Sequence, residues 1–264
     1  MPSSHSQTVD PTENLSTNTL KRLLETVTQT ADRYVDLSDR RLVVLRILKE
    51  LTGATAGYWA WGHEDGTEKS VVAVALINLG FTEQQMAAYV KASFAPEVHR
   101  DFVEPIKKRM GTQLQITLTR EELYQELAWK ETFLGQQLKL IGFEEWLQSI
   151  RYSREETWSQ LFLLRSVGEM PFQPEDRALI DIAMSSISWL HSSQAESIPQ
   201  EQLRGLSPRQ RAVMLMLLDG VSRKQIASRF AIGEETVGDH IKQIYRHFDI
   251  NTAGELSALF LRGK

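Results

Sequence analysis

The segment from Glu234 to Phe248 combines an apolar stripe with a polar face whose side chains can pair with nucleic acid. The apolar residues recur at helical spacing and predict an amphipathic helix with one buried side: Val237, Ile241, Ile244, Tyr245 and Phe248. The opposite side carries Asp239, Lys242, Gln243 and Arg246. Carboxylate, amide, ammonium and guanidinium groups of this kind pair with base edges and with phosphates. This helix is therefore the first candidate site.

Capping signals delimit the helices that must position this one. Ser207 and Gln210, Ser222 and Gln225, and Thr252 and Glu255 form three capping boxes, and each pair opens a predicted helix. Gly220 ends the first of these helices, because glycine adopts the left-handed cap conformation at little cost. A tight turn over residues 231–233 separates the second from the polar helix. A short helix, a turn and an amphipathic helix form a helix-turn-helix arrangement, whose second helix fits the major groove, about 12 Å wide.

Residues 206–261 resemble the LuxR-type DNA-binding domain, also called NarL- or FixJ-like, along their whole length. The resemblance rests on the following residues: Leu206, Ser207, Pro208, Arg209, Gly220, Ser222, Lys224, Ile226, Ala227, Ile232, Thr236, Val237, His240, Ile244, Glu255 and Leu256. It implies a four-helix domain that binds double-stranded DNA as a dimer, on a partly symmetric site.

The resemblance also assigns roles to single residues. The base-reading positions of the family fall on Gly238, Asp239 and Lys242, and Lys242 is the strongest single candidate for a base or phosphate contact. Gly238 replaces a commonly basic residue and lowers helix stability by roughly 0.5–1 kcal/mol relative to alanine. The expected sugar-phosphate contacts are Lys224, Thr236, Gln243 and Arg246. His240 lies at the edge of the apolar stripe, where it can pack, cap or touch DNA.

Composition places this domain at the end of a larger, acidic chain. The 264 residues suit two domains and carry a net charge of −4. From Arg204 onward there are ten basic and six acidic residues, so the preceding part carries −8. There is no cysteine, which excludes disulfides, thiolate metal sites and thioether-linked bilins. No apolar run approaches the roughly 20 residues that span a bilayer, and no signal-peptide core is present at the N-terminus.

The N-terminal part is predicted to be an α+β domain that spans residues 19–195. A disordered tail at 1–18 precedes this domain, and a linker at 196–203 joins it to the helix-turn-helix domain at 204–264. We expect helices over 19–35 and 39–51, strands over 55–61 and 70–79 joined by an Asp-Gly turn, and a helical middle from 82 to 141. Strands over 145–152 and 157–167 and a last helix reaching His191 follow. This order predicts an antiparallel sheet with helices on one face.

The end of this domain resembles the close of GAF-type sensor domains. The resemblance lies in Pro171, Phe172, Glu175 and Asp176, which form a Pro-Phe-x-x-Glu-Asp turn before the last helix. GAF and PAS folds commonly enclose a small-molecule cavity between sheet and helices. The candidate lining residues are Trp59, Trp61, Phe94, Trp129, Phe133, Trp146 and Trp158. Aromatic residues at such spacing are also ordinary core residues, and that interpretation stays open.

Two other input domains fit the residues less well. A phosphoreceiver domain needs alternating parallel strands and helices with acidic residues at strand ends. The N-terminal domain at 19–195, which we call the body, lacks that alternation. An acyl-homoserine-lactone receptor domain carries an Asp-Pro pair after its aromatic cluster, whereas the only such pair here is Asp10-Pro11, in the tail. The lactone receptors nevertheless share a similar arrangement of sheet and helices.

We find no signature of catalysis or of a resident cofactor or metal. The six histidines are scattered, and no phosphate-binding glycine loop, His-Glu-x-x-His or Gly-x-Ser-x-Gly sequence occurs. The sequence therefore predicts a cytoplasmic, homodimeric, non-enzymatic transcriptional regulator, with DNA, a small-molecule effector and RNA polymerase as candidate partners and no membrane association. Two alternatives keep the DNA-binding tail: a body that binds only proteins, or, more remotely, a body that modifies a small molecule.

Overall fold

The computed structural model describes residues 15–34, 37–64, 71–93, 95–124, 126–152, 157–191, 205–218, 221–230 and 232–261. The chain divides into two compact units. The first comprises Met1–Trp59, Ile77–Ile150 and Gln160–Leu190, and the second comprises Ala60–Leu76, Arg151–Ser159 and His191–Lys264. The predicted tail up to residue 14, the Asp-Gly turn and the whole predicted linker at 196–203 lie outside the described residues. The predicted domain boundaries stay a prediction.

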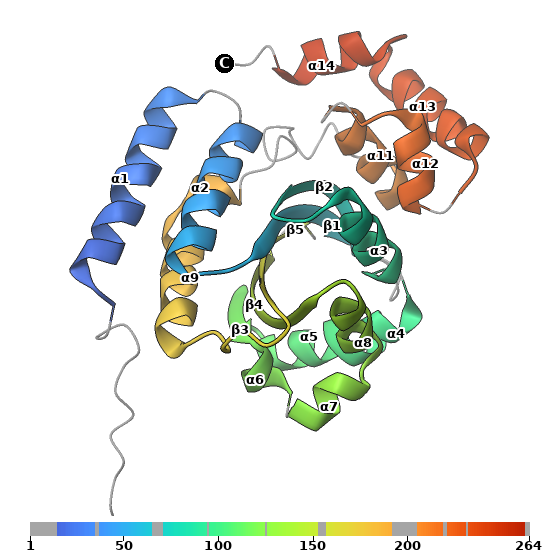
Figure 1. Cartoon of the computed structure of the whole chain (residues 1–264). Coiled ribbons are helices and arrows are strands. Elements are labelled where there is room, and N and C mark those ends of the chain that lie inside the picture. Colours follow the sequence, from blue (N-terminus) through green and yellow to red (C-terminus); the bar gives the residue numbers. More distant parts are fainter. Residues whose placement is uncertain are drawn as a thin grey trace, which may run out of the picture. The chain divides into compact units, whose positions relative to one another are not determined.

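A five-stranded sheet forms the centre of the N-terminal part (Figure 1). Its strands are β1 (Ala56–Glu64), β2 (Val71–Leu79), β3 (Gln115–Thr119), β4 (Phe143–Tyr152) and β5 (Thr157–Ser166), in the order β2-β1-β5-β4-β3. The N–H of Thr55 donates to the carbonyl of Leu164 (2.8 Å), which fixes the register between the start of β1 and the end of β5. That pairing is antiparallel, as expected.

Strand β3 is a correction to the predicted helical middle. Gln115–Thr119 is only five residues long and lies between helices, which concealed it. Its alternating threonines connect to two neighbours: Thr117 Oγ1 lies 2.8 Å from Ser149 Oγ on β4 and donates to Asp181 Oδ1 at 2.6 Å. Tertiary hydrogen bonds, rather than local hydrophobic periodicity, therefore stabilise this edge strand.

Helices α2 (Leu37–Leu51) and α9 (Pro174–Ser186) lie against one face of the sheet, and α1 (Thr17–Arg33) packs against α2 (Figure 1). Leu45 and Leu48 of α2 and Ile180 and Met184 of α9 are fully buried in one core. Odd-numbered strand residues join them, because successive side chains of a strand point to opposite faces: Trp59, Leu147, Leu161 and Leu163. The last helix ends at Ser186, followed by a 3-10 turn over Ser188–Leu190, which is short of the predicted His191.

Helices cover the other face of the sheet as well. The prediction that helices lie on one face alone is therefore wrong. In Figure 1 the covering elements are α3 (Glu83–Ser93), α4 (Pro96–Val98), the π-helical turn η2 (His99–Val103), α5 (Glu104–Met110), α6 (Arg120–Leu123), α7 (Glu126–Glu131) and α8 (Phe133–Leu140). Tyr89 of α3, Phe102 of η2 and Trp129 of α7 place their rings against even-numbered strand residues. A three-layer arrangement results.

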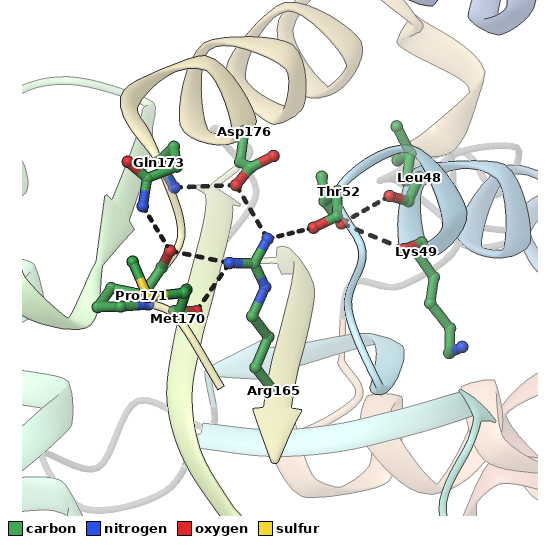
Figure 2. Close-up of polar contacts among 8 residues, drawn as sticks. All are labelled: Leu48, Lys49, Thr52, Arg165, Met170, Pro171, Gln173 and Asp176. Atoms are coloured by element: carbon green, nitrogen blue, oxygen red, sulfur yellow. Dashed lines mark hydrogen bonds and ion pairs between the residues drawn. The ribbon is translucent and has the colours of Figure 1, made fainter. Parts of the chain in front are cut away.

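Arg165 joins β5 to the Pro-Phe-x-x-Glu-Asp turn and to the end of α2 (Figure 2). Its Nη1 donates to the carbonyls of Met170 and Pro171, both at 2.8 Å, and its Nη2 donates to Thr52 O and to Asp176 Oδ2. Asp176 also accepts the N–H of Gln173 (2.9 Å) and so caps α9. The turn is thus held by one guanidinium.

The C-terminal segment is helical as predicted, with α11 (Pro208–Leu218), α12 (Arg223–Phe230), α13 (Glu234–Phe248) and α14 (Ala253–Leu261). Val213, Ile226, Val237, Ile244 and Leu256 are buried together, and one residue of this set comes from each helix except α13, which supplies two. The apolar stripe of α13 therefore faces the core. No helix in the described ranges is long and apolar enough to span a membrane.

Candidate nucleic-acid interface and candidate ligand site

Side-chain caps position the helices around α13. The N–H of Ser207 donates to Gln210 Oε1 (2.7 Å) and the N–H of Gln210 donates to Ser207 Oγ (3.2 Å), which is a complete capping box. Ser222 and Gln225 make the same reciprocal pair at 3.0 and 3.3 Å. In the third box Glu255 accepts the N–H of Asn251 (2.9 Å) beside its contact with Thr252. Each box satisfies N–H groups that a helix start leaves unpaired.

The polar face of α13 is open to solvent. Thr236, Asp239, Lys242 and Arg246 are exposed, and Lys242 Nζ lies 3.0 Å from Asp239 Oδ1. Gln243 hydrogen-bonds Gln210 of α11, which orients its amide. Lys224 is exposed on the first turn of α12. Since an exposed ion pair contributes at most about 1 kcal/mol, Lys242 can exchange Asp239 for another anion at little cost.

His240 differs from its neighbours because it is half-buried. Burial and then the charge of Arg209 hold the pKa of His240 below its usual value, against the opposing effect of Asp239. The fold therefore favours the neutral imidazole at this position. The side chain lies at the edge of the apolar stripe, where packing and DNA contact both remain open to it.

Gly238 is buried although it lies on the polar side of α13. A Cβ atom built on Gly238 would lie 2.9 Å from Cζ of Arg223, the first residue of α12. Arg223 Nε donates to the carbonyl of Glu234 at 2.5 Å, which holds the guanidinium across the helix. The residue spacing along α13 did not single out Arg223, which belongs to α12. A glycine in the middle of a polar helix face was the signal that another side chain could cover it.

A cluster of aromatic rings fills the space between the sheet and the helices α3 to α8. Trp146 of β4 stacks on Phe162 of β5 with centroids 5.9 Å apart, and Phe102 and Trp129 meet the edge of Trp146 at 5.3 and 5.9 Å. Tyr58 lies 5.3 Å from Phe162. We call these five residues the ring cluster.

A polar group adjoins the ring cluster. The hydroxyls of Tyr58 and Tyr89 lie 2.6 Å apart, and Gln160 Nε2 donates to Tyr58 at 2.9 Å. Burial is the main cause that raises the pKa of Tyr89 to about 12 and the pKa of Tyr58 well above its usual value. Both phenols are therefore neutral hydrogen-bonding groups at physiological pH.

The buried polar atoms without a hydrogen-bond partner among the described residues include Trp146 Nε1, Gln148 Oε1 and the hydroxyl of Tyr124. Trp146 is fully buried and Gln148 is 4% exposed, and they are alternate residues of β4, so both point to the ring-cluster face. Leaving such an atom unpaired costs about 1–3 kcal/mol, and native proteins rarely do so without a bound molecule or a function.

The predicted pocket residues divide between the two sides of the sheet. Trp129 and Trp146 belong to the ring cluster, and Phe133 is half-buried on α8. Trp59 packs on the opposite face, in the core with α2 and α9. Trp61 is buried in the cluster that contains the apolar residues of α11 to α14. Trp158 is buried on β5 in the second unit, and Phe94 lies outside the described residues. Trp59 and Trp61 are therefore left out of the candidate ligand site.

No group of three or more His, Asp or Glu side chains that could hold a metal ion occurs within the described ranges. A buried ion pair joins α6 to β4: Arg120 Nε donates to Glu145 Oε2 at 2.8 Å, and both side chains are less than one-tenth exposed.

Comparison with solved structures finds matches at low similarity. SdiA in complex with octanoyl-rac-glycerol has a TM-score of 0.45 and 10% identity, covering 92% of this chain and 94% of its own. Escherichia coli SdiA in a second structure has a TM-score of 0.44 and 12% identity, covering 90% and 95%. CepR2 from Burkholderia cenocepacia, described as an N-acylhomoserine lactone-dependent LuxR-family transcription factor, has a TM-score of 0.42 and 13% identity. The match covers 66% of this chain and 92% of CepR2. At these values the likeness assigns no ligand to this chain.

The search of curated proteins finds no significant match to this chain. The comparison with protein families is decisive for the C-terminal domain alone, and the GAF resemblance of the body stays a prediction. The family described as bacterial regulatory proteins, luxR family, matches residues 204–258, which contain α11, α12, α13 and the start of α14. Residues 204–258 are therefore a DNA-binding domain of the luxR family of bacterial regulatory proteins, which makes the chain a DNA-binding regulator.

Proposed function

We propose that the chain is a sequence-specific transcriptional regulator whose N-terminal body binds a small molecule that controls DNA binding. The observation that carries the DNA-binding part is the exposed polar face of α13, a helix held by three capped neighbours within the matched luxR-family domain. The recognition helix of such a domain lies in the major groove, with its N-terminal residues at the base edges.

Each polar residue of this face has a role in the proposal. Lys242 contacts a base or a phosphate, and Asp239 accepts from a cytosine amino group once Lys242 releases it. The backbone contacts come from Lys224, Thr236, Gln243 and Arg246. His240 lies at the margin of the interface. Exposure of Lys224, Thr236, Lys242 and Arg246 supports these roles.

The test uses the full chain and a duplex that it selects from a randomised pool. For Lys242→Ala we expect binding to that duplex to weaken by about 1–3 kcal/mol, the value of a good base contact. The control is Lys21→Ala, an exposed lysine of α1. Equal affinity of the wild type and Lys242→Ala, in an anisotropy titration at fixed salt, would remove α13 from the interface.

The unpaired Trp146 Nε1 and Gln148 Oε1 support a ligand on the ring-cluster face. The indole N–H can only donate and the amide oxygen can only accept, so the ligand carries at least one acceptor and one donor close together. The surrounding rings favour an apolar or aromatic remainder. The neutral tyrosine hydroxyls can add hydrogen bonds without adding charge.

A thermal-shift screen on the full chain tests this part. The screen includes octanoyl-rac-glycerol, an N-acylhomoserine lactone and flat heteroaromatic compounds. We expect at least one compound to raise the melting temperature of the wild type, and to raise it less in Trp146→Phe, which lacks the indole N–H. Trp189→Phe is the matched control, because Trp189 packs in the other core. No stabilising compound, or equal shifts in Trp146→Phe and the wild type, would contradict the site.

The exposed apolar side chains of the body favour a second candidate function, protein binding without a ligand. Leu140 is 79% exposed and Met170 is 74% exposed. The thermal-shift screen separates the two candidates, since this alternative predicts no stabilising compound.

The proposed regulator acts as a homodimer in the cytoplasm, where it meets DNA and RNA polymerase. Helix-turn-helix proteins commonly bind two half-sites through two copies of the domain, which supports the dimer. Light scattering of the full chain with and without the selected duplex measures it. A complex that contains one copy for each duplex would contradict the homodimer.

A further inference from the structure

The volume beside Gly238 is occupied by a side chain from another helix. The three heavy atoms nearest to a Cβ built on Gly238 all belong to the Arg223 guanidinium: Cζ at 2.9 Å, Nη2 at 3.0 Å and Nη1 at 3.2 Å. Real Cβ atoms essentially never come within 3.0 Å of another atom. Any residue other than glycine would therefore displace the guanidinium from α13.

The guanidinium is held in place but retains free donors. Arg223 Nε donates to the carbonyl of Glu234, at the start of α13. The side chain is exposed, and neither Nη1 nor Nη2 hydrogen-bonds another described residue. One donor thus positions a planar group beside the recognition helix, and its two outer nitrogens make no hydrogen bond to another described residue. α12 packs against α13 (Figure 1), so the side chain of Arg223 reaches α13 from the neighbouring helix.

Charge explains what the guanidinium adds. The first two turns of α13 carry Glu234, Glu235 and Asp239, whereas Lys242 is the first cation of the helix. Three carboxylates at the end of a helix that enters a groove lined by phosphates would repel DNA. Arg223 places a positive charge among them, beside Gly238. Gly238 precedes Lys242 by four residues on α13 and therefore lies on the same helix face.

We propose that Arg223 reads a guanine in the major groove, in the place of the side chain that Gly238 lacks. The two outer nitrogens of arginine match O6 and N7 of guanine, which is the commonest specific contact between proteins and DNA. The proposal rests on the proposed DNA binding through α13. It makes Arg223 a specificity-determining residue that belongs to α12 and not to the recognition helix.

The test compares sequence selection and affinity for four full-length proteins: the wild type, Arg223→Ala, Arg223→Lys and Gly238→Ala. Each selects duplexes from a randomised pool, and each is titrated against the wild-type selected duplex at several salt concentrations. Arg46→Ala is the control, because Arg46 is exposed on α2, far along the chain from this site. Thermal melts confirm that each variant is folded.

We expect Arg223→Ala to lose a guanine preference at one position in each half-site and to bind the selected duplex about 5- to 150-fold more weakly. Arg223→Lys should also lose that preference, because an ammonium group cannot form the paired contact. Gly238→Ala should lose it while the helix itself gains propensity, so a folding defect cannot explain the result.

Two results would overturn the proposal. Unchanged selection by Arg223→Ala and Gly238→Ala would leave Arg223 as a structural contact to Glu234. A loss of affinity that is the same for all DNA sequences would make Arg223 a phosphate contact instead, if the slope of log affinity against log salt concentration also became shallower by about one. If the wild type itself selects no duplex, the proposed function fails first, and this outcome is distinct from both.

Discussion

At the scale of the residue, Arg165 shows how one side chain holds several segments. Its guanidinium satisfies three backbone carbonyls and Asp176, and its plane lies over Phe172 with Cζ 4.3 Å from the ring centroid. Both partners of the ion pair are less than one-fifth exposed. Removing the buried guanidinium leaves the carboxylate of Asp176 and the three carbonyls without their donor. The resulting loss of stability exceeds the net contribution of the ion pair itself.

Arg165→Ala should therefore lower the free energy of unfolding of the body by about 3–5 kcal/mol. Urea unfolding, followed by tryptophan fluorescence, measures the change. Arg46→Ala is the control, since Arg46 is exposed on α2. A loss under about 1 kcal/mol would mean that solvent replaces the guanidinium without difficulty.

The lowered pKa of His240 makes the stability of the C-terminal helices depend on pH. The pKa lies below its ordinary value of 6.5, first because of burial and then because of Arg209. A histidine with a lowered folded-state pKa contributes stability that is present above pH 6.5 and is lost as the pH falls through the folded-state pKa. We expect the wild type to lose more stability than His240→Gln between pH 7.5 and 5.5. Equal losses in two urea titrations would refute the assignment.

At the scale of the element, the helix caps determine where α11, α12 and α14 begin. Ser222→Ala should destabilise the C-terminal helices by about 0.5–2 kcal/mol, because the first N–H groups of α12 lose their acceptor. Ser222→Gly should cost only a few tenths of a kcal/mol, since glycine is tolerated at an N-cap. Circular dichroism melts of the two variants give the comparison, and identical melts would show that the cap contributes nothing.

Elements with local signals could be predicted and those that depend on distant partners could not. The bounds of α13 and the three capping boxes follow from spacing within a few residues, and the structure confirms them. Strand β3 depends on Ser149 and Asp181, which are 32 and 64 residues away from Thr117. The side of the sheet that Trp59 occupies depends on strand parity and on helices from both ends of the body. Arg223 escaped notice for the same reason, since its position depends on a glycine in another helix.

At the scale of the whole molecule, the proposed regulator needs its body to influence its DNA-binding domain. Our hypothesis is that the segment from Ser192 to Leu203 transmits a change in dimer geometry and so alters the spacing of half-sites, without changing α13 itself. This segment lies outside the described residues.

Under this hypothesis the body changes affinity for the selected duplex. We expect the full chain and a fragment of residues 204–264 to differ in affinity by at least several-fold at equal salt, with the helical content of the fragment checked by circular dichroism. A compound found in the thermal-shift screen should change the affinity of the full chain but not that of the fragment. Equal affinities for all four combinations would contradict the coupling.

The proposed regulator recognises a particular DNA sequence through α13 and its neighbours. Selection from a randomised duplex pool by the full-length wild type tests it most directly, with the full-length Lys242→Ala protein selected in parallel. We predict enrichment of a partly symmetric site in which two half-sites are separated by about one helical turn, 10–10.5 base pairs. For Lys242→Ala we predict a weaker or altered site. A pool that shows no enriched sequence after repeated rounds with a folded wild type would contradict it.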